Sequence, residues 1–121
     1  MVSLTRWRRI MTTMISAEFR KRWFTLPLAD QLGNVGSEMG RARAWQGRDE
    51  KAFWGAARRA LELLDLTRED TRWRNRRPEL DCARETTTDA ILGGSEYGST
   101  LADLESYFMQ FTLFARRHKV E

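Results

Sequence analysis

The sequence predicts an all-α protein, an antiparallel up-down four-helix bundle with an additional N-terminal helix or tail. The clearest observation is residues 53–66, FWGAARRALELLDL, where apolar residues recur on one side of a helix: Phe53, Ala57, Ala60, Leu61 and Leu64. The 121 residues also include only two prolines, and no run alternates as a strand would. Hydrophobic residues make up 41% and charged residues 31%, which is typical of a folded domain. One amphipathic helix is marginal alone, so further helices are expected to cover its stripe.

A helix is expected from about residue 28 to 45, beginning after Pro27. Its apolar residues repeat at alternating steps of four and three, the seam of an antiparallel bundle: Leu28, Leu32, Val35, Met39 and Ala42. Gly33, Gly36 and Gly40 are unusual inside a helix, because each costs about 0.5–1 kcal/mol relative to Ala. They predict a close approach of two helices, and a ligand site at exposed backbone is the alternative.

Three more segments complete the predicted bundle. Asp49 is expected to cap the central helix, which runs to residue 66 or 67 with Arg58, Arg59, Glu62 and Asp65 mostly on its polar side. Pro78 opens a third helix, which Gly93 and Gly94 end. Thr100 and Asp103 form a capping-box-like pair at the start of the last helix, residues 101–117, whose inner residues are Leu104, Phe108, Phe111 and Ala115.

Charge divides the chain into a basic amphipathic N-terminal extension, residues 1–25, and a nearly neutral helical domain, residues 26–121. The extension carries six Arg or Lys residues against Glu18, whereas the rest carries 15 basic and 16 acidic residues. The extension has three open interpretations: an additional helix packing on the domain, a tail, or a basic helix lying on anionic membrane or nucleic acid.

Composition and spacing argue against several chemistries. The single Cys82 excludes an intramolecular disulfide and favours a reducing, cytoplasmic setting. The single His118 lies in a basic run without a partner at metal-ligand spacing, and there is neither a phosphate loop nor a dinucleotide fingerprint. No apolar run reaches the roughly 18 residues of a membrane span. We therefore expect no catalytic residue, metal, cofactor or membrane partner.

Polar residues share faces on two of the predicted helices. Asn34, Ser37, Glu38 and Arg41 lie on one face of the first, and Arg84, Glu85 and Asp89 on one face of the third. If these faces meet, Glu38 and Arg41 would pair with Arg84 and Asp89. The favoured interpretation is structural. A small-ligand or enzyme site at Asn34, Glu38, Glu85 and Asp89 is the alternative.

Residues 68–77, REDTRWRNRR, are expected to form a loop, with at most one short turn. Arginines can neutralise phosphates and an exposed Trp can stack on a base, which makes this the strongest local signal for nucleic-acid binding. The candidate contacts are Arg72, Trp73, Arg74, Arg76 and Arg77. A solvated, partly salt-bridged loop is the favoured alternative.

The stretches LADQLGNVGSEMGRA, RALELLDLT and ILGGSEYGSTLADLESYFMQFTLFAR resemble a small prokaryotic family of helical proteins. Members carry similar Asn-x-Gly-Ser-Glu, Ala-Leu-Glu-Leu-Leu-Asp-Leu-Thr and Glu-Tyr-Gly-Ser elements. The resemblance spans about residues 28–116 and implies no activity. It draws attention to the matching positions Asn34, Gly36, Ser37, Glu38, Asp89, Glu96 and Tyr97.

The predicted architecture also resembles the HEPN class of four-helix proteins, which includes toxin ribonucleases and nucleotidyltransferase partners. The ribonuclease members carry an Arg a short distance before a His. Positions 111–113 hold no Arg ahead of His118, so that motif is missing. This resemblance therefore implies a partner or antitoxin-type protein rather than a nuclease.

The leading functional prediction is a non-enzymatic protein–protein interaction module, as a homodimer or with another protein. It rests on the aromatic last helix, whose Tyr107, Phe108, Phe111 and Phe114 are more apolar around the circumference than one neighbour requires. Nucleic-acid binding through residues 1–25 and 72–77 is the first alternative. A ligand or enzyme site at the polar faces is the second.

Overall fold

The computed structural model describes residues 15–118, and within this range the chain is all-helical without a strand, as predicted. Residues 15–118 form five α-helices and one 3-10 helix: α2 (Ala17–Trp23), α3 (Leu28–Trp45), α4 (Glu50–Glu69), η1 (Thr71–Arg76), α5 (Arg77–Ile91) and α6 (Leu101–His118).

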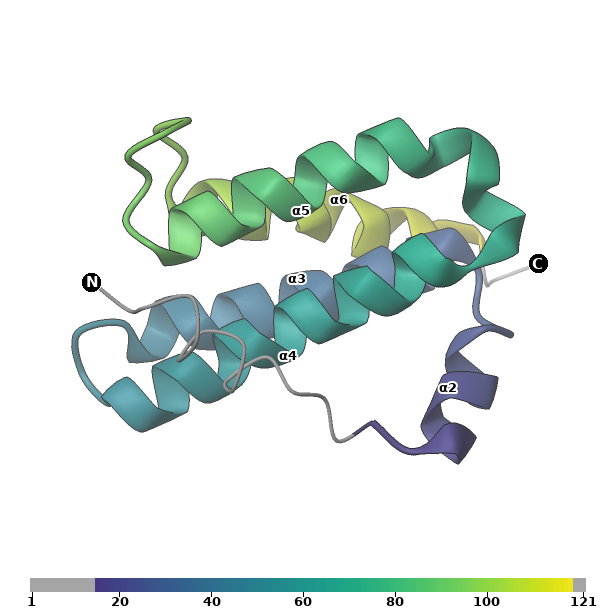
Figure 1. The fold of residues 1–121 in the computed structure, drawn as a ribbon, viewed down its shortest axis with the longest axis horizontal. Helices are drawn as coiled ribbons and strands as arrows, with labels where there is room; N and C mark the ends of the chain where they lie inside the picture. Colours follow the sequence, from purple (N-terminus) through teal and green to yellow (C-terminus); the bar gives the residue numbers. More distant parts are fainter. Residues whose placement is uncertain (1–14, 119–121) are drawn as a thin grey trace.

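The four long helices run along the same long axis, with short connections at alternating ends (Figure 1). α3 makes the most extensive contacts, with α4 on one side and α6 on the other. α5 packs against α4 and more sparsely against α6. The short α2 lies at one end of the molecule, where it contacts α4.

Local chemistry sets several helix boundaries at the residues that the sequence predicted. The Asp49 carboxylate accepts the Ala52 amide at 3.0 Å and starts α4. At α6 the capping box is complete, because Asp103 accepts the Thr100 amide at 2.9 Å and Thr100 accepts the Asp103 amide at 3.1 Å. Gly93, with φ of +116°, ends α5 in a conformation that residues with a Cβ rarely adopt.

The predicted loop at residues 68–77 is wrong in part. α4 continues to Glu69, η1 follows at once, and α5 begins at Arg77, ahead of Pro78. The turn between α4 and η1 forms because the Asp70 carboxylate caps the Arg72 amide at 3.1 Å. This is a local bond between residues two positions apart, which Asp side chains commonly make at turns.

The C-terminal part of the predicted N-terminal extension packs on the rest of the chain. Ser16 caps α2, and Trp23 at its end is only 3% exposed within the core cluster. Trp23 stacks on Phe19 with ring centroids 5.8 Å apart. The interpretation as an added helix therefore holds for residues 17–23, while residues 1–14 lie outside the described residues.

The helices α3 and α6 meet through the three glycines, as predicted. A Cβ on Gly36 would lie 2.7 Å from Cβ of Phe108, and one on Gly33 would lie 2.7 Å from Oγ1 of Thr112. A Cβ on Gly40 would overlap the carboxylate of Glu105. The missing side chains let the backbones approach, and Phe108 becomes fully buried.

We predict that Gly36→Ala destabilises the fold by about 1–3 kcal/mol, because neither the Phe108 Cβ nor its backbone can move without shifting α6. The matched control is Gly55→Ala in α4, where a Cβ meets nothing within 4 Å. That change should stabilise the protein by about 0.5–1 kcal/mol through helix propensity. Urea unfolding of both variants measures the difference, and equal effects at the two positions would contradict the close approach.

Candidate functional site

The structure separates the predicted polar site into two clusters. Asn34, Ser37 and Glu38 line a groove of about 520 Å³ between α2, α3 and α4. Glu85, Asp89, Glu96 and Tyr97 lie instead where α5 ends and the loop to α6 begins. No single site holds the whole predicted set.

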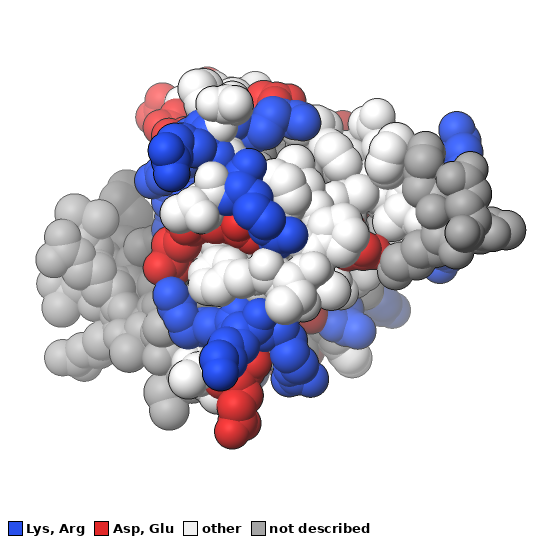
Figure 2. All heavy atoms as spheres, turned by 90° about the vertical axis from the view of Figure 1, so that its right-hand side faces the viewer, with Lys and Arg blue, Asp and Glu red and all other residues white. Residues whose placement is uncertain are grey.

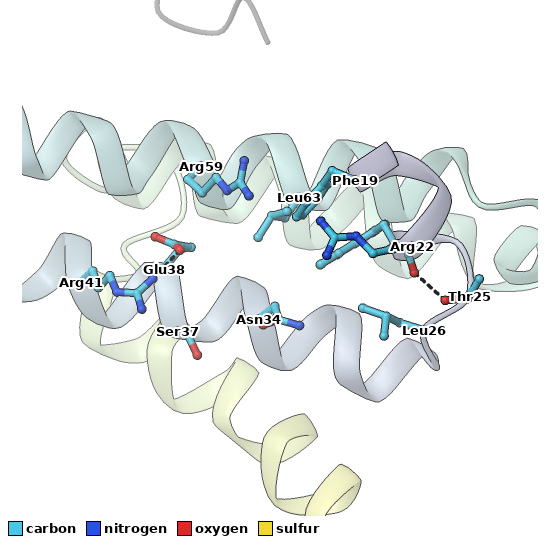
Figure 3. Close-up of a pocket in the computed structure, with 11 residues that line it drawn as sticks. Phe19, Arg22, Thr25, Leu26, Asn34, Ser37, Glu38, Arg41, Arg59 and Leu63 are labelled. Atoms are coloured by element: carbon cyan, nitrogen blue, oxygen red, sulfur yellow. Dashed lines mark hydrogen bonds and ion pairs between the residues drawn. The ribbon is translucent and has the colours of Figure 1, made fainter. Parts of the chain in front are cut away.

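The groove is bordered by three arginines, each from a different helix (Figure 3). Arg41 of α3 binds Glu38 at 2.5 Å, and Arg59 of α4 lies over the Phe19 ring, 4.7 Å from its centroid. The guanidinium of Arg22 is 5.9 Å from the same centroid. The charges at the groove are thus partly engaged by neighbouring side chains.

The other predicted groups of this cluster bond to their own helix. Asn34 Nδ2 donates to the Asp30 carbonyl at 2.9 Å, and Ser37 Oγ donates to the Gly33 carbonyl at 3.3 Å. Both are i to i−4 bonds, which polar side chains make on a helix surface without any ligand.

Asp89 holds the loop between α5 and α6. It is 7% exposed, and its two carboxylate oxygens accept the amides of Glu96 at 3.0 Å and Tyr97 at 2.9 Å. The Tyr97 hydroxyl donates to Glu85 at 3.3 Å, and the charge of Glu85 raises the pKa of Tyr97. The geometry of this cluster is that of a loop anchor.

The predicted pairing of Glu38 and Arg41 with Arg84 and Asp89 is wrong. Arg84 instead donates to Asp65 of α4 at 2.8 Å. The reason is the packing order: α5 lies against α4 and α6, so its polar face meets α4 and not α3.

The candidate nucleic-acid contacts are mostly engaged within the fold. Arg76 binds Glu79 at 2.5 Å, and Arg77 binds Asp81 at 3.3 Å. Figure 2 shows this end of the molecule, where basic and acidic side chains alternate around a patch of uncharged ones. Arg74 is exposed and forms no ion pair with any described residue. The favoured alternative, a partly salt-bridged segment, agrees with these contacts.

Trp73 is not the exposed stacking platform that the sequence suggested. It is half-buried, and its Nε1 donates to Oε1 of Gln31 at 2.8 Å. One face of the ring is covered by Arg72, whose guanidinium lies 4.4 Å from the centroid. A base could reach that face of the ring only after Arg72 moved.

Sequence reasoning missed the centre of this region, Gln31. It is fully buried, and its Nε2 donates to the Trp23 carbonyl at 2.8 Å and to Asp70 at 3.1 Å, while its Oε1 accepts from Trp73. The signal available was its position among Leu28, Leu32 and Val35 on the inner stripe of α3. We call Trp23, Gln31, Asp70, Arg72 and Trp73 the Gln31 network.

Asp70 is the negatively charged member of the Gln31 network and pairs with Arg72. Its carboxylate accepts Nε and Nη2 of Arg72 at 3.0 and 2.7 Å. Burial alone would raise the pKa of Asp70, but the hydrogen bonds from Arg72 and Gln31 outweigh it and hold this pKa below its ordinary value of 3.8. Asp70 is therefore a stabilising anion at neutral pH.

We predict that Asp70→Asn lowers the free energy of unfolding by about 1.5–3 kcal/mol at pH 7, because charge-assisted hydrogen bonds are lost. The folded-state pKa lies below the unfolded one, so the wild-type advantage is present above about pH 4 and declines as pH falls further. Thermal or urea unfolding from pH 3 to 7 measures it. A difference independent of pH would contradict the charge assignment.

Glu62 is buried although the sequence placed it on the polar side of α4. Its side chain is 6% exposed, Arg58 and Arg59 lie only at 3.7 and 3.9 Å, and its Oε1 has no hydrogen-bond partner among described residues. Burial raises its pKa, and the two arginines oppose this effect without cancelling it. The ionised form is therefore disfavoured in the folded state.

Glu62→Gln should change the pH dependence in the opposite direction to Asp70→Asn. The stabilising contribution of protonated Glu62 is complete below its ordinary pKa of 4.5 and is lost as pH rises through the raised folded-state value. As pH rises above 4.5, the free energy of unfolding of the wild type should therefore fall relative to that of Glu62→Gln. Thermal or urea unfolding at a series of pH values measures this difference. A constant difference would show that Glu62 titrates normally.

Helix α6 exposes four large apolar side chains away from the core. Tyr107 is 38%, Met109 45%, Leu113 51% and Phe114 53% exposed. The predicted aromatic set is thus divided, because Phe108 is fully buried and Phe111 half-buried against the core.

A hollow of about 280 Å³ adjoins Tyr107 between α5 and α6. It is lined mainly by apolar atoms of Ala83, Leu104 and Tyr107, with Cys82 also at its wall and the acidic Glu79 and Asp103 at its edge. The hollow exists because α5 packs against α6 only sparsely.

The described residues contain neither a metal-binding cluster nor a membrane-spanning helix. Among residues 15–118 no three His, Cys, Asp or Glu side chains gather as a metal-binding group. None of the helices in that range is long and apolar enough to cross a membrane. No protein-family model, curated protein or solved structure matches this chain. The family resemblances inferred from the sequence therefore stay predictions.

Proposed function

We propose that the chain is a four-helix-bundle interaction module that binds a protein partner through the outer face of α6. The observation that carries this proposal is the exposure of Tyr107, Met109, Leu113 and Phe114 on one helix. Fully burying a side chain of this size contributes about 1.5–3 kcal/mol, so a partner that covers several of them gains substantial binding free energy. Exposed apolar surface of this kind is typical of interaction sites.

The arrangement of the helices explains why α6 is incompletely covered. α6 turns Leu101, Leu104 and Phe108 inward against α3, where the close glycine contact holds it. α5, its other neighbour, touches it only sparsely.

The two alternatives have less support from the contacts. Arg72, Arg76 and Arg77 each have an acidic partner, and Trp73 is hydrogen-bonded inside the fold. The predicted ligand site is divided between two places. Neither arrangement exposes as much apolar side-chain surface as α6 does.

The test is the double variant Leu113→Glu with Phe114→Glu, whose side chains are exposed enough to be replaced without disturbing the core. We expect the dissociation constant for the partner to rise at least about tenfold, as for central interface residues. Light scattering after size exclusion measures self-association, and affinity capture with mass spectrometry measures binding to other proteins.

Trp45→Glu is the matched control, because Trp45 is a large apolar side chain, 45% exposed, on a different helix. It should leave the interaction unchanged. If no association of either kind depends on Leu113 and Phe114, the proposed function is wrong.

A further inference from the structure

We propose that the occupant of the α6 face is a second copy of this chain, docked with the two α6 helices antiparallel about a two-fold axis near Gln110. This inference rests on the proposed function and identifies the partner. It follows from the order of residues along α6, from the charges at its two ends and from the hollow beside it.

The outer side of α6 carries a seam with coiled-coil spacing. Exposed residues follow at steps of four, three, four and three: Asp103, Tyr107, Gln110, Phe114 and Arg117. This is the spacing by which one helix presents a continuous stripe to another. Gln110 is the midpoint of the stripe, with one aromatic residue and one charged residue on each side.

The order of the stripe is self-complementary only when the second helix is antiparallel. A two-fold axis at Gln110 brings Asp103 opposite Arg117 of the second copy, and the reciprocal pair forms at the other end. It also brings Tyr107 close to Leu113 and Phe114 of the second copy. A parallel pair would place like charges together at both ends, which is unfavourable. Each contact occurs twice, as in any isologous dimer.

The charges at the two ends are available for this pairing. Asp103 accepts the Thr100 amide, and this hydrogen bond lowers its pKa, so that Asp103 is ionised at neutral pH. Glu79 lies beside the same end of the seam, but Arg76 already pairs with it, so Asp103 is the acidic group that the second copy would meet. At the other end Arg116 and Arg117 are exposed and form no ion pair with any described residue. Antiparallel helices also align their dipoles favourably.

The hollow between α5 and α6 adds a shape argument. It opens beside Asp103 and Tyr107, the half of the seam that faces Phe114 of the second copy. Its walls are largely apolar, and at about 280 Å³ it offers room for an aromatic ring. We expect Phe114 of the second copy to insert into this hollow. By symmetry the same contact forms a second time, so that Phe114 and the exposed Cys82 of each copy are covered.

The experiment is a charge-reversal set in the full chain, measured by analytical ultracentrifugation at low salt. Asp103→Arg and Arg117→Asp each place like charges opposite one another at both ends, and each should raise the dimer dissociation constant at least about tenfold. The double variant restores opposite charges and should recover dimerisation. Because it shares the capping change of Asp103→Arg, it also controls for any effect on folding.

A measurement on the unmutated chain is independent of these variants. Cys82 is the only cysteine and lines the hollow, so its rate of reaction with a thiol reagent measures whether the hollow is accessible to solvent. The rate should fall as protein concentration rises, in step with the dimer fraction.

The outcomes separate the inference from the proposed function. Dimerisation that survives both single reversals, or is not recovered by the double variant, overturns the antiparallel seam. A concentration of about 100 μM is well above the dissociation constant of a micromolar dimer. If the chain is still monomeric there but binds a different protein through Leu113 and Phe114, self-association is wrong and the proposed function stands. A monomer without any α6-dependent binding overturns both.

Discussion

The close contact of α3 with α6 is the constraint on which the rest of the arrangement depends. Gly33, Gly36 and Gly40 allow the two backbones to approach, and this places Phe108 in the core with no exposed surface. Because a helix is rigid about its axis, burying Phe108 settles which residues of α6 face outward. The exposed apolar side chains of α6 are therefore a consequence of where the glycines lie on α3, one helix away.

Polar residues in this protein serve assembly more than chemistry. Asp89 anchors the loop before α6, Asp70 and Gln31 join α2, α3 and η1, and Arg84 links α5 to α4. Each was a plausible ligand-binding group by residue type alone. In the folded protein their hydrogen-bonding capacity is largely used by the backbone and by one another, which leaves an apolar surface as the best candidate for function.

What could be predicted from the sequence was what depends on neighbours along the chain. The helices, the cap at Asp49, the Thr100–Asp103 box and the glycine contact all follow from spacing within one segment. The hydrogen bonds of the buried Gln31 join it to Asp70 and Trp73, about forty positions further along the chain, and local periodicity carries no information about such contacts. For the same reason the candidate polar site was assembled wrongly: the faces of α3 and α5 have the right spacing, but the helices are not adjacent.

The Gln31 network has a consequence for how the molecule opens. α2 has only seven residues, far below the roughly 12–15 at which an isolated helix becomes even marginally stable in water. Its order comes from Trp23, whose carbonyl and indole bind Gln31 and Thr67. Withdrawing Trp23 would remove one of the two hydrogen bonds of the buried Gln31 amide nitrogen and the indole bond to the buried Thr67 hydroxyl, so partial fraying is penalised. The amides of α2 should therefore exchange with solvent as one cooperative unit with this end of α3 and α4, and not as a loose terminal segment.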